Sequence, residues 1–368
     1  MKIAINCSFF MPKGGGIKEY IFNLVNNLAL LDNVNEYILY VAADQYDYAK
    51  NNLPNKMKIK KTPFKSSESF KRSLFEKKFY LEEEKYENFD IFHSPFFHIP
   101  PLKRAKKIIT VHDLRLYRYP KTYSFFRYYF LKYAVNKSIK SADHIITISE
   151  FTKNEILSFF NISPDKITPV HEAINTSFFS EDIIMDYFPT NDELKNSPFL
   201  LSVGHLEPRK NYNKLILAFN KFKNQFPENP LKLVIVGQKS LGYETTLKLI
   251  DESKDILYLD FVEHKLLVWL YKNAKLFIFP SYYEGFGFPP LEAAVLNTVS
   301  VVSNKSSIPE ICGDSSFYFN PNDTDSIWET IITSLEQVEQ KRVLLKENLS
   351  RFSWVKNAQS TLDIYNNI

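Results

Sequence analysis

Short apolar runs alternate with longer amphipathic runs along the whole chain, and this alternation constrains the fold more than any other feature. Many of the short runs are continuously apolar, as in parallel strands that helices cover on both faces. The sequence therefore predicts an α/β protein with parallel sheets. The expected strands are residues 2–7, 37–42, 89–93, 107–111, 144–148, 199–203, 231–236, 256–259, 276–279 and 299–302, and the clearest helices are residues 20–31, 149–160, 213–226 and 264–273.

The length of the chain predicts two domains. It has 368 residues, more than a usual single domain, and ten strands in this order suit two doubly wound sheets better than one. An acidic, irregular segment near residues 176–198 is the expected boundary. We expect an N-terminal domain at residues 1–180, a C-terminal domain at residues 181–350, and a last helix at residues 351–368 that packs back on the first domain.

Composition narrows the class of protein. The net charge of +4 fits a partner that carries phosphate but gives no argument for nucleic acid. The two cysteines, Cys7 and Cys312, suggest neither a disulfide framework nor a cysteine metal site. No apolar run reaches the length that spans a bilayer, and the first residues enter a strand without a signal-peptide pattern. We expect a cytoplasmic protein.

Residues 281–292, SYYEGFGFPPLE, place two carboxylates, Glu284 and Glu292, with seven residues between them. A strand-like run precedes this segment and a helix-like run follows it. We therefore expect Glu284 on a loop at the carboxyl end of a strand and Glu292 in the first turn of the next helix. Ligands of open α/β sheets bind at this edge, and a helix start attracts phosphate through its N–H groups and its dipole.

Gly204 ends another expected strand, and Arg209 and Lys210 follow it at a helix start. The two cations are either a phosphate clamp or two solvated charges. Asp323 and Asp325 mimic a metal-binding Asp-x-Asp pair, but they precede a helix, where aspartate is a routine N-cap. No group of His, Cys and Asp shows metal-ligand spacing, so we expect neither a metal nor another cofactor.

The first half of the chain offers two candidate loops of its own. Gly14, Gly15 and Gly16 follow the first strand, and they match neither the dinucleotide fingerprint nor a P-loop. His112 and Asp113 follow a later strand and are candidate catalytic residues at the same kind of sheet edge. Two weaker candidates, which either line an acceptor site or are structural, are His93 and His98.

Taken in order, these motifs resemble the retaining glycosyltransferases of family four, which have the GT-B fold. The resemblance covers nearly the whole chain and implies two Rossmann-like, doubly wound domains that face a cleft. The matching motifs are residues 14–16 (GGG), 110–114 (TVHDL), 146–151 (ITISEF), 203–211 (VGHLEPRKN), 281–292 (SYYEGFGFPPLE) and 306–314 (SSIPEICGD).

The resemblance also implies a role for each matching residue. Arg209 and Lys210 would hold the donor diphosphate. Glu284 would bind hydroxyls of the donor sugar near the reacting carbon, and Glu292 would bind the ribose. His112 would lie near the primary carbon of the donor sugar. The implied catalytic set is Glu284, His112 and Asp113; further donor-binding residues are Gly204, Val262, Gly285, Phe286 and Gly287; the loop that closes over phosphate and acceptor is Gly14, Gly15 and Gly16.

The activity that the resemblance implies is transfer of a hexose from a nucleotide-diphosphate sugar, with retention of configuration and without a metal. The leaving phosphate would help to deprotonate the acceptor. Many relatives carry an arginine after the glycine that is Gly204 here, and this chain has His205, which resembles the mannosyltransferase-like branch. Because residues 306–314 also resemble mannosyltransferases, we expect GDP-mannose as donor. The expected acceptor is a saccharide or lipid-linked glycan, in surface polysaccharide or lipopolysaccharide synthesis. A UDP- or dTDP-sugar donor, a nucleotide-sugar epimerase and a binding subunit without catalysis are the alternatives, whereas the missing fingerprint disfavours a dinucleotide oxidoreductase.

Residues 117–133, YRYPKTYSFFRYYFLKY, interleave aromatic rings with Lys and Arg, and residues 64–80 do so upstream. Such a pattern suits the surface of a membrane with anionic lipids. It also suits a helix with an aromatic core face and a solvated basic face. An anionic membrane surface is therefore a candidate partner, which would place the protein on the inner face of the cytoplasmic membrane.

Overall fold

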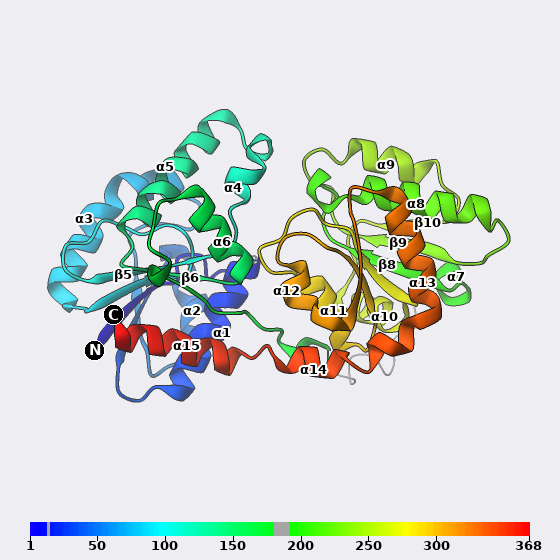
Figure 1. The fold of residues 1–368 in the computed structure, drawn as a ribbon. Coiled ribbons are helices and arrows are strands. Elements are labelled where there is room, and N and C mark those ends of the chain that lie inside the picture. The colour runs from blue at the N-terminus through cyan, green and yellow to red at the C-terminus, as the bar shows by residue number, and fades with distance from the viewer. Residues whose placement is uncertain (13–14, 180–191) are drawn as a thin grey trace. The chain divides into compact units, whose positions relative to one another are not determined.

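The computed structural model describes residues 1–12, 15–179 and 192–368, which form two compact units (Figure 1). The first unit comprises Met1–Ala173 and Ser353–Ile368, and the second comprises Ile174–Phe352. The boundary thus lies at Ala173 and Ile174, somewhat before the expected position after residue 180. The last helix belongs to the first unit, because Trp354 lies against Tyr20 of α1 with their ring centroids 6.0 Å apart.

The first unit is built on a sheet of seven parallel strands in the order β3-β2-β1-β4-β5-β6-β7. Its direction of growth reverses between β1 and β4, which makes the sheet doubly wound. The strands are β1 Lys2–Asn6, β2 Glu36–Val41, β3 Lys58–Lys61, β4 Ile91–Ser94, β5 Lys106–Val111, β6 His144–Thr147 and β7 Ile167–Pro169.

Helices cover both faces of this sheet (Figure 1). Tyr80, Val135 and Ile156 pack into one core on the face that carries α3, α5 and α6, and α1 and α15 lie along the opposite face. The helices of the unit are α1 Gly15–Leu31, α2 Tyr46–Asn52, α3 Ser69–Glu87, α4 Arg115–Arg118, α5 Phe125–Ser141, α6 Glu150–Phe159 and α15 Trp354–Asn367.

The second unit repeats the plan with six parallel strands in the order β10-β9-β8-β11-β12-β13. The order reverses between β8 and β11. The strands are β8 Phe199–Val203, β9 Lys232–Val236, β10 Ile256–Leu259, β11 Leu276–Phe279, β12 Ser300–Ser303 and β13 Ser316–Phe319. The helices are α7 Asp192–Asn196, α8 Tyr212–Gln225, α9 Glu244–Asp251, α10 His264–Asn273, α11 Phe288–Val295, α12 Ile308–Cys312, α13 Thr324–Arg342 and α14 Leu345–Ser350.

The sheet of the second unit has a core on each face. Phe219 of α8, Ile250 of α9 and Ile331 of α13 join one core, whereas Tyr271 of α10 and Ile308 of α12 join the other. Burial on both faces explains why the central strands are continuous apolar runs. Two parallel, doubly wound sheets confirm the predicted fold class.

Three strands that the sequence did not predict are β3, β7 and β13. All three lie at an outer edge of a sheet, where one flank has no neighbouring strand. Edge strands are short and carry polar residues, as in the KIKK sequence of β3. β3 therefore lacks the apolar run by which the central strands were recognised, β7 has only three residues, and β13 was missed although its SFYF sequence is largely aromatic.

One smaller expectation is confirmed. The Asp323 side chain accepts a hydrogen bond of 2.9 Å from the backbone N–H of Asp325 and caps α13, as predicted. Within the described residues, no helix is both long and apolar enough to cross a membrane. Both cysteines, Cys7 and Cys312, are free and buried.

Candidate donor and catalytic site

The loops that follow β8 and β11 lie side by side at the carboxyl edge of the second sheet. The strands themselves are neighbours at the point where the strand order reverses, and this is where open α/β sheets bind their ligands. The backbone N–H of Tyr282, in the loop after β11, donates a 2.9 Å hydrogen bond to the Arg209 carbonyl in the loop after β8. The backbone thereby fixes the position of one loop against the other.

Glu284 lies between two cations that come from the other loop. Its Oε2 lies 2.9 Å from Arg209 Nη1, and its Oε1 lies 2.7 Å from Lys210 Nζ. Ser281 also donates a 2.6 Å hydrogen bond to Oε1. All three charged side chains are largely withdrawn from solvent, with 11–13% of each exposed. The structure thus brings together the three residues that the sequence put forward for sugar and diphosphate.

The charges within this cluster balance. Burial alone would raise the pKa of Glu284, but Lys210 and Arg209 outweigh burial and hold this pKa below its ordinary value. Arg209 also pairs with Glu207 at 2.5 Å, so two cations face two carboxylates. The buried Nε of Arg209 has no hydrogen-bond partner among the described residues. An unsatisfied buried donor is costly, so a further acceptor at this guanidinium would be favourable.

Two glycines let the loops after β8 and β9 approach each other closely. Gly204 and Gly237 have φ angles of 152° and 154°. A Cβ atom on Gly237 would lie 1.9 Å from the Gly204 carbonyl oxygen, which leaves no room for a side chain. Tyr212 donates a 2.9 Å hydrogen bond to the same carbonyl. Gly204, one of the predicted donor-binding residues, is thus held at the sheet edge beside Lys210.

The helix after the glutamate loop begins earlier than the sequence suggested. α11 starts at Phe288, with Gly287 as its N-cap at a φ of 121°, because prolines are well tolerated in a first turn. Glu292 therefore lies in the second turn, and its predicted place in the first turn is wrong. Pro289 and Pro290 carry no N–H, so the start of α11 offers phosphate the amides of Gly287 and Phe288 alone.

The rest of the predicted donor loop is held by serine. Ser307 donates hydrogen bonds to the backbone carbonyls of Glu284 at 3.0 Å and Phe286 at 2.6 Å. The ring of Phe286 is buried and lies edge-on to Phe352. Phe286 therefore anchors the loop through its side chain.

Glu292 has a different environment from Glu284. Tyr271 donates a 2.7 Å hydrogen bond to its Oε2. Burial raises the pKa of Glu292, and the hydrogen bond from Tyr271 and the charge of Lys210 offset only part of this effect. The two glutamates are therefore pushed in opposite directions, and they form no hydrogen bond to each other that would make them an acid–base pair. Val262, the last predicted donor residue, lies after β10 and is partly packed against the core.

In the first unit, His112 follows β5 and makes two hydrogen bonds to acceptors. Its Nε2 lies 2.9 Å from the Pro95 carbonyl oxygen, and its Nδ1 lies 3.1 Å from Glu172 Oε1. Burial alone would lower the pKa of His112, but Glu172 outweighs burial and raises it. Asp113 is exposed, and its Oδ1 accepts a 2.9 Å hydrogen bond from the Arg115 N–H at the start of α4.

The other residues predicted in this unit are placed less centrally. Gly15 and Gly16 are the first residues of α1 rather than part of an extended loop, and Gly14 lies outside the described residues. His93 is fully buried in β4, where it bonds Tyr365 and Thr110 at 2.6 and 2.9 Å. Burial lowers the pKa of His93 to about 3 and keeps the ring neutral, which favours its structural interpretation.

Comparison with known proteins identifies the chain. The model of Glycosyltransferase Family 4 matches residues 14–178, and the model of Glycosyl transferases group 1 matches residues 186–351. The chain is a family-four glycosyltransferase of the GT-B fold. One match covers most of the first half of the chain and the other covers most of the second half, so both units of the glycosyltransferase match a family model.

Individual relatives of the glycosyltransferase agree. O-antigen chain mannosyltransferase B of Escherichia coli is 29% identical over 292 residues, which are 75% of this chain and 74% of the relative. O-antigen chain mannosyltransferase RfbU of Salmonella typhimurium is 30% identical over 258 residues, or 70% of this chain and 66% of the relative. The crystal structure of Anabaena HepE in complex with UDP has a TM-score of 0.73 at 16% identity and covers both chains completely, which shows a shared fold.

Two side chains that hold candidate site residues of the glycosyltransferase were not predicted from the sequence. Each lies on a segment distant in sequence from the residue it contacts: Glu172 contacts His112, and Tyr271 contacts Glu292. Neither belongs to a recognisable motif, so only the fold could reveal them. Among the described residues, no group of His, Cys, Asp and Glu is arranged to hold a metal ion.

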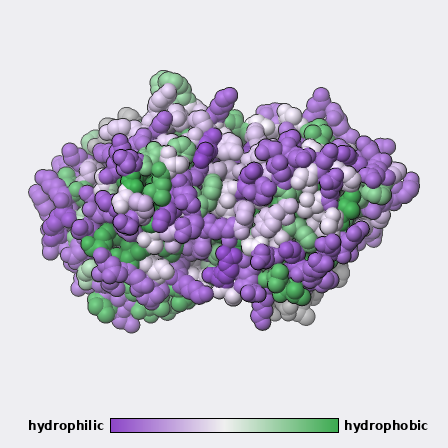
Figure 2. All heavy atoms as spheres, viewed as in Figure 1, coloured by the Kyte–Doolittle hydropathy of each residue, from purple (hydrophilic) through white to green (hydrophobic). Residues whose placement is uncertain are grey.

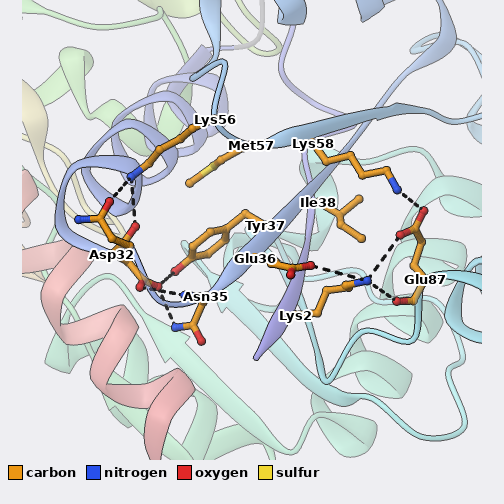
Figure 3. Close-up of a pocket in the computed structure, with 11 residues that line it drawn as sticks. Lys2, Asp32, Asn35, Glu36, Tyr37, Ile38, Lys56, Met57, Lys58 and Glu87 are labelled. Atoms are coloured by element: carbon orange, nitrogen blue, oxygen red, sulfur yellow. Dashed lines mark hydrogen bonds and ion pairs between the residues drawn. The ribbon is translucent and has the colours of Figure 1, made fainter.

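A hollow also lies in the first unit, at the amino edge of its sheet, opposite the carboxyl edge that carries His112. It has a volume of about 330 Å³ and is lined where β1, β2 and β3 begin (Figure 3). Two ion pairs occupy it, with Lys58 and Glu87 2.7 Å apart and Lys2 and Glu36 3.8 Å apart, and Lys56 donates to the Asp32 carbonyl and the Asn33 side chain. Since the hollow is at the amino ends of the strands and its cations already have partners, we do not assign the donor to it.

Proposed function

We propose that this glycosyltransferase moves mannose from GDP-mannose to a saccharide or lipid-linked glycan, with retention of configuration, in surface polysaccharide synthesis. The observation that carries the proposal is Glu284 clasped by Arg209 and Lys210 at the carboxyl edge of the second sheet. The choice of mannose is supported by the two O-antigen chain mannosyltransferases, each about as similar to this chain as the other.

The chemistry requires stabilisation of charge on both sides of the bond that breaks. When the bond from the anomeric carbon to the β-phosphate oxygen breaks, negative charge grows on the diphosphate and positive charge on the sugar. Arg209 and Lys210 would stabilise the diphosphate, together with the amides at the start of α11. Glu284, kept ionised by its low pKa, would accept hydrogen bonds from the sugar hydroxyls.

Retention follows if the acceptor attacks from the face that the diphosphate leaves. The acceptor oxygen then bonds to the anomeric carbon, and its proton passes to an oxygen of the departing phosphate, so that GDP carries the proton away. No separate base is needed. This assignment fits His112, because Pro95 and Glu172 accept hydrogen bonds from both of its ring nitrogens and leave neither as a base.

Glu292 would bind the ribose hydroxyls of the nucleotide. The hydroxyl of Tyr271 already binds Oε2 of Glu292. Glu292 lies in the second turn of α11, so the first turn of that helix separates it from the loop that carries Glu284. The two carboxylates would therefore grip the two ends of one nucleotide sugar rather than share a proton.

A panel of nucleotide sugars tests the proposal. Purified protein is mixed with GDP-mannose and with UDP- and dTDP-hexoses, and thermal stabilisation, sugar release and the anomeric configuration of the product are measured by NMR. We expect stabilisation and turnover with GDP-mannose and an axial product like the donor. Stabilisation by uridine but not guanosine nucleotides would overturn the donor, an inverted product would overturn retention, and conversion to another nucleotide sugar without acceptor would make the protein an epimerase.

A further inference from the structure

Helix α5 turns a row of large aromatic side chains toward solvent. Between 50% and 85% of each of five aromatic residues is exposed, namely Phe125, Phe126, Tyr129, Phe130 and Tyr133. In the same helix, Val135 and Ile139 are buried against the sheet. The interpretation of this segment as a helix with an aromatic core face is therefore wrong for these five rings. Tyr117 and Tyr128 do pack partly against the core.

The exposed rings form one continuous patch. Phe125, Tyr129 and Tyr133 follow one another at intervals of four residues, and Phe126 and Phe130 form the adjacent row, so both rows lie along one side of the helix. The rings of Phe125 and Tyr129 are 4.7 Å apart, and those of Phe125 and Phe126 are 5.7 Å apart. In Figure 2 hydrophobic groups reach the surface at the top of the first unit, where α5 lies in Figure 1.

The charge around this patch has one sign. Residues 115–141 contain seven Lys and Arg residues and no Asp or Glu. The whole chain has a net charge of +4, so the remainder of the protein is net negative. Arg127, Lys132 and Lys137 lie within 6.0 Å of the ring centres of neighbouring tyrosines. One cation, Arg118, instead pairs with the buried Glu155.

Exposed aromatic rings flanked by cations are the combination that an anionic lipid surface binds. Aromatic and apolar side chains enter the boundary between head groups and acyl chains, and nearby Lys and Arg side chains are attracted to anionic head groups. An acidic soluble partner would satisfy the cations but not five exposed rings in a row. Monomeric proteins rarely leave such a patch uncovered without a use for it.

We propose that α5 and the α4–α5 connection dock this enzyme on an anionic lipid bilayer, with the aromatic row in the interface and the cations on lipid phosphates. The segment begins at Arg115, three residues after His112, so docking would hold the carboxyl edge of the first sheet near the membrane. This use rests on the lipid-linked acceptor of the proposed function, but lipid binding itself can be measured without any sugar.

The test is flotation of the full-length protein with vesicles. One set holds equal amounts of phosphatidylglycerol and phosphatidylcholine, and the other holds phosphatidylcholine alone. We expect binding to the anionic vesicles that weakens with salt, and a loss of at least tenfold in the double variant Phe126→Ser with Phe130→Ser. Phe261→Ser, which removes a 74% exposed ring in the second unit, is the matched control and should bind as the wild type does.

Three results would overturn the docking surface. The first is that the wild type does not bind anionic vesicles. The second is that the double variant binds them as well as the wild type does. The third is that the wild type self-associates and the double variant does not, since the patch would then join two copies. Hydrolysis of GDP-mannose in solution separates this proposal from the proposed function. The double variant should retain this hydrolysis, whereas a donor misassignment would abolish it in the wild type and leave vesicle binding unchanged.

Discussion

Glu172 holds His112 with both ring nitrogens facing acceptors. Glu172 Oε1 lies 3.1 Å from Nδ1, and the Pro95 carbonyl lies 2.9 Å from Nε2. A neutral imidazole can donate from one nitrogen only, so both contacts are satisfied when the ring is an imidazolium. Asp113 also raises the pKa of His112, whereas the nearby His93 stays neutral and adds no charge of its own.

Substitution Glu172→Gln should lower the pKa of His112, because the amide retains a hydrogen-bond partner but removes the negative charge that outweighs burial. NMR titration of the His112 ring measures this pKa directly. Asp113→Asn, which removes an exposed and more weakly coupled charge, is the matched control and should cause a smaller shift. An unchanged His112 pKa in Glu172→Gln would contradict the ion pair.

The same pair should make stability depend on pH. The folded pKa of His112 is above its ordinary value of about 6.5, so the stabilisation is fully present below that value. It is lost as pH rises through the folded pKa. Urea denaturation of the wild type should therefore show an unfolding free energy that falls over this window, and Glu172→Gln should flatten the change. An equal pH slope in both proteins would exclude this source.

If Glu284 binds the donor sugar as proposed, Glu284→Gln should reduce sugar transfer by about a hundredfold or more, since it removes the charge that would face the reacting sugar. Affinity for GDP should stay the same or rise, because Arg209 and Lys210 no longer have Glu284 as a competing anion. Transfer assays and calorimetry measure the two effects, with circular dichroism to verify folding. Near-normal turnover of a folded variant would remove Glu284 from the catalytic site.

Arg209→Ala should change GDP binding in the opposite direction. Loss of a charge-assisted contact to phosphate weakens binding by about tenfold to a hundredfold. Lys221→Ala is a suitable control, because Lys221 is an exposed cation on α8 that pairs with Asp325. Calorimetry that finds the same GDP affinity in Arg209→Ala as in the control would show that the guanidinium only supports the loops.

Gly237→Ala should destabilise the second unit by about 3 kcal/mol or more, through a clash with the Gly204 carbonyl and a backbone that side chains rarely adopt. Gly16→Ala is the contrasting variant. A Cβ there meets no atom within 4 Å, so stability should change by about 1 kcal/mol or less. Thermal or urea unfolding compares the two, and a Gly237→Ala protein as stable as the wild type would refute the close approach.

The central strands and the fold class could be predicted because parallel strands buried on both faces need continuous apolar runs. The edge strands β3 and β7 could not, since KIKK has no apolar run and ITP has only three residues. Asp323 was predicted as a helix cap from local spacing alone. Local sequence likewise placed Glu284 on a loop and Arg209 and Lys210 beside a glycine turn.

Which groups those residues meet was decided by the tertiary structure. Tyr271, which donates to Glu292, is 21 residues away from it, and Lys210, which donates to Glu284, is 74 residues away. No local pattern encodes such pairs. Local sequence does not decide whether Pro289 and Pro290 lie inside or before α11. Because both lie inside it, Glu292 is in the second turn rather than the first. The sequence by itself determined the sheets and the residue types at their carboxyl edge, because period and turn chemistry are local. Only the packing of those edges determined that Glu284 is an ionised partner of two cations, that His112 is held by Glu172, and that the rings of α5 face solvent, because burial and charge pairing arise when distant segments meet.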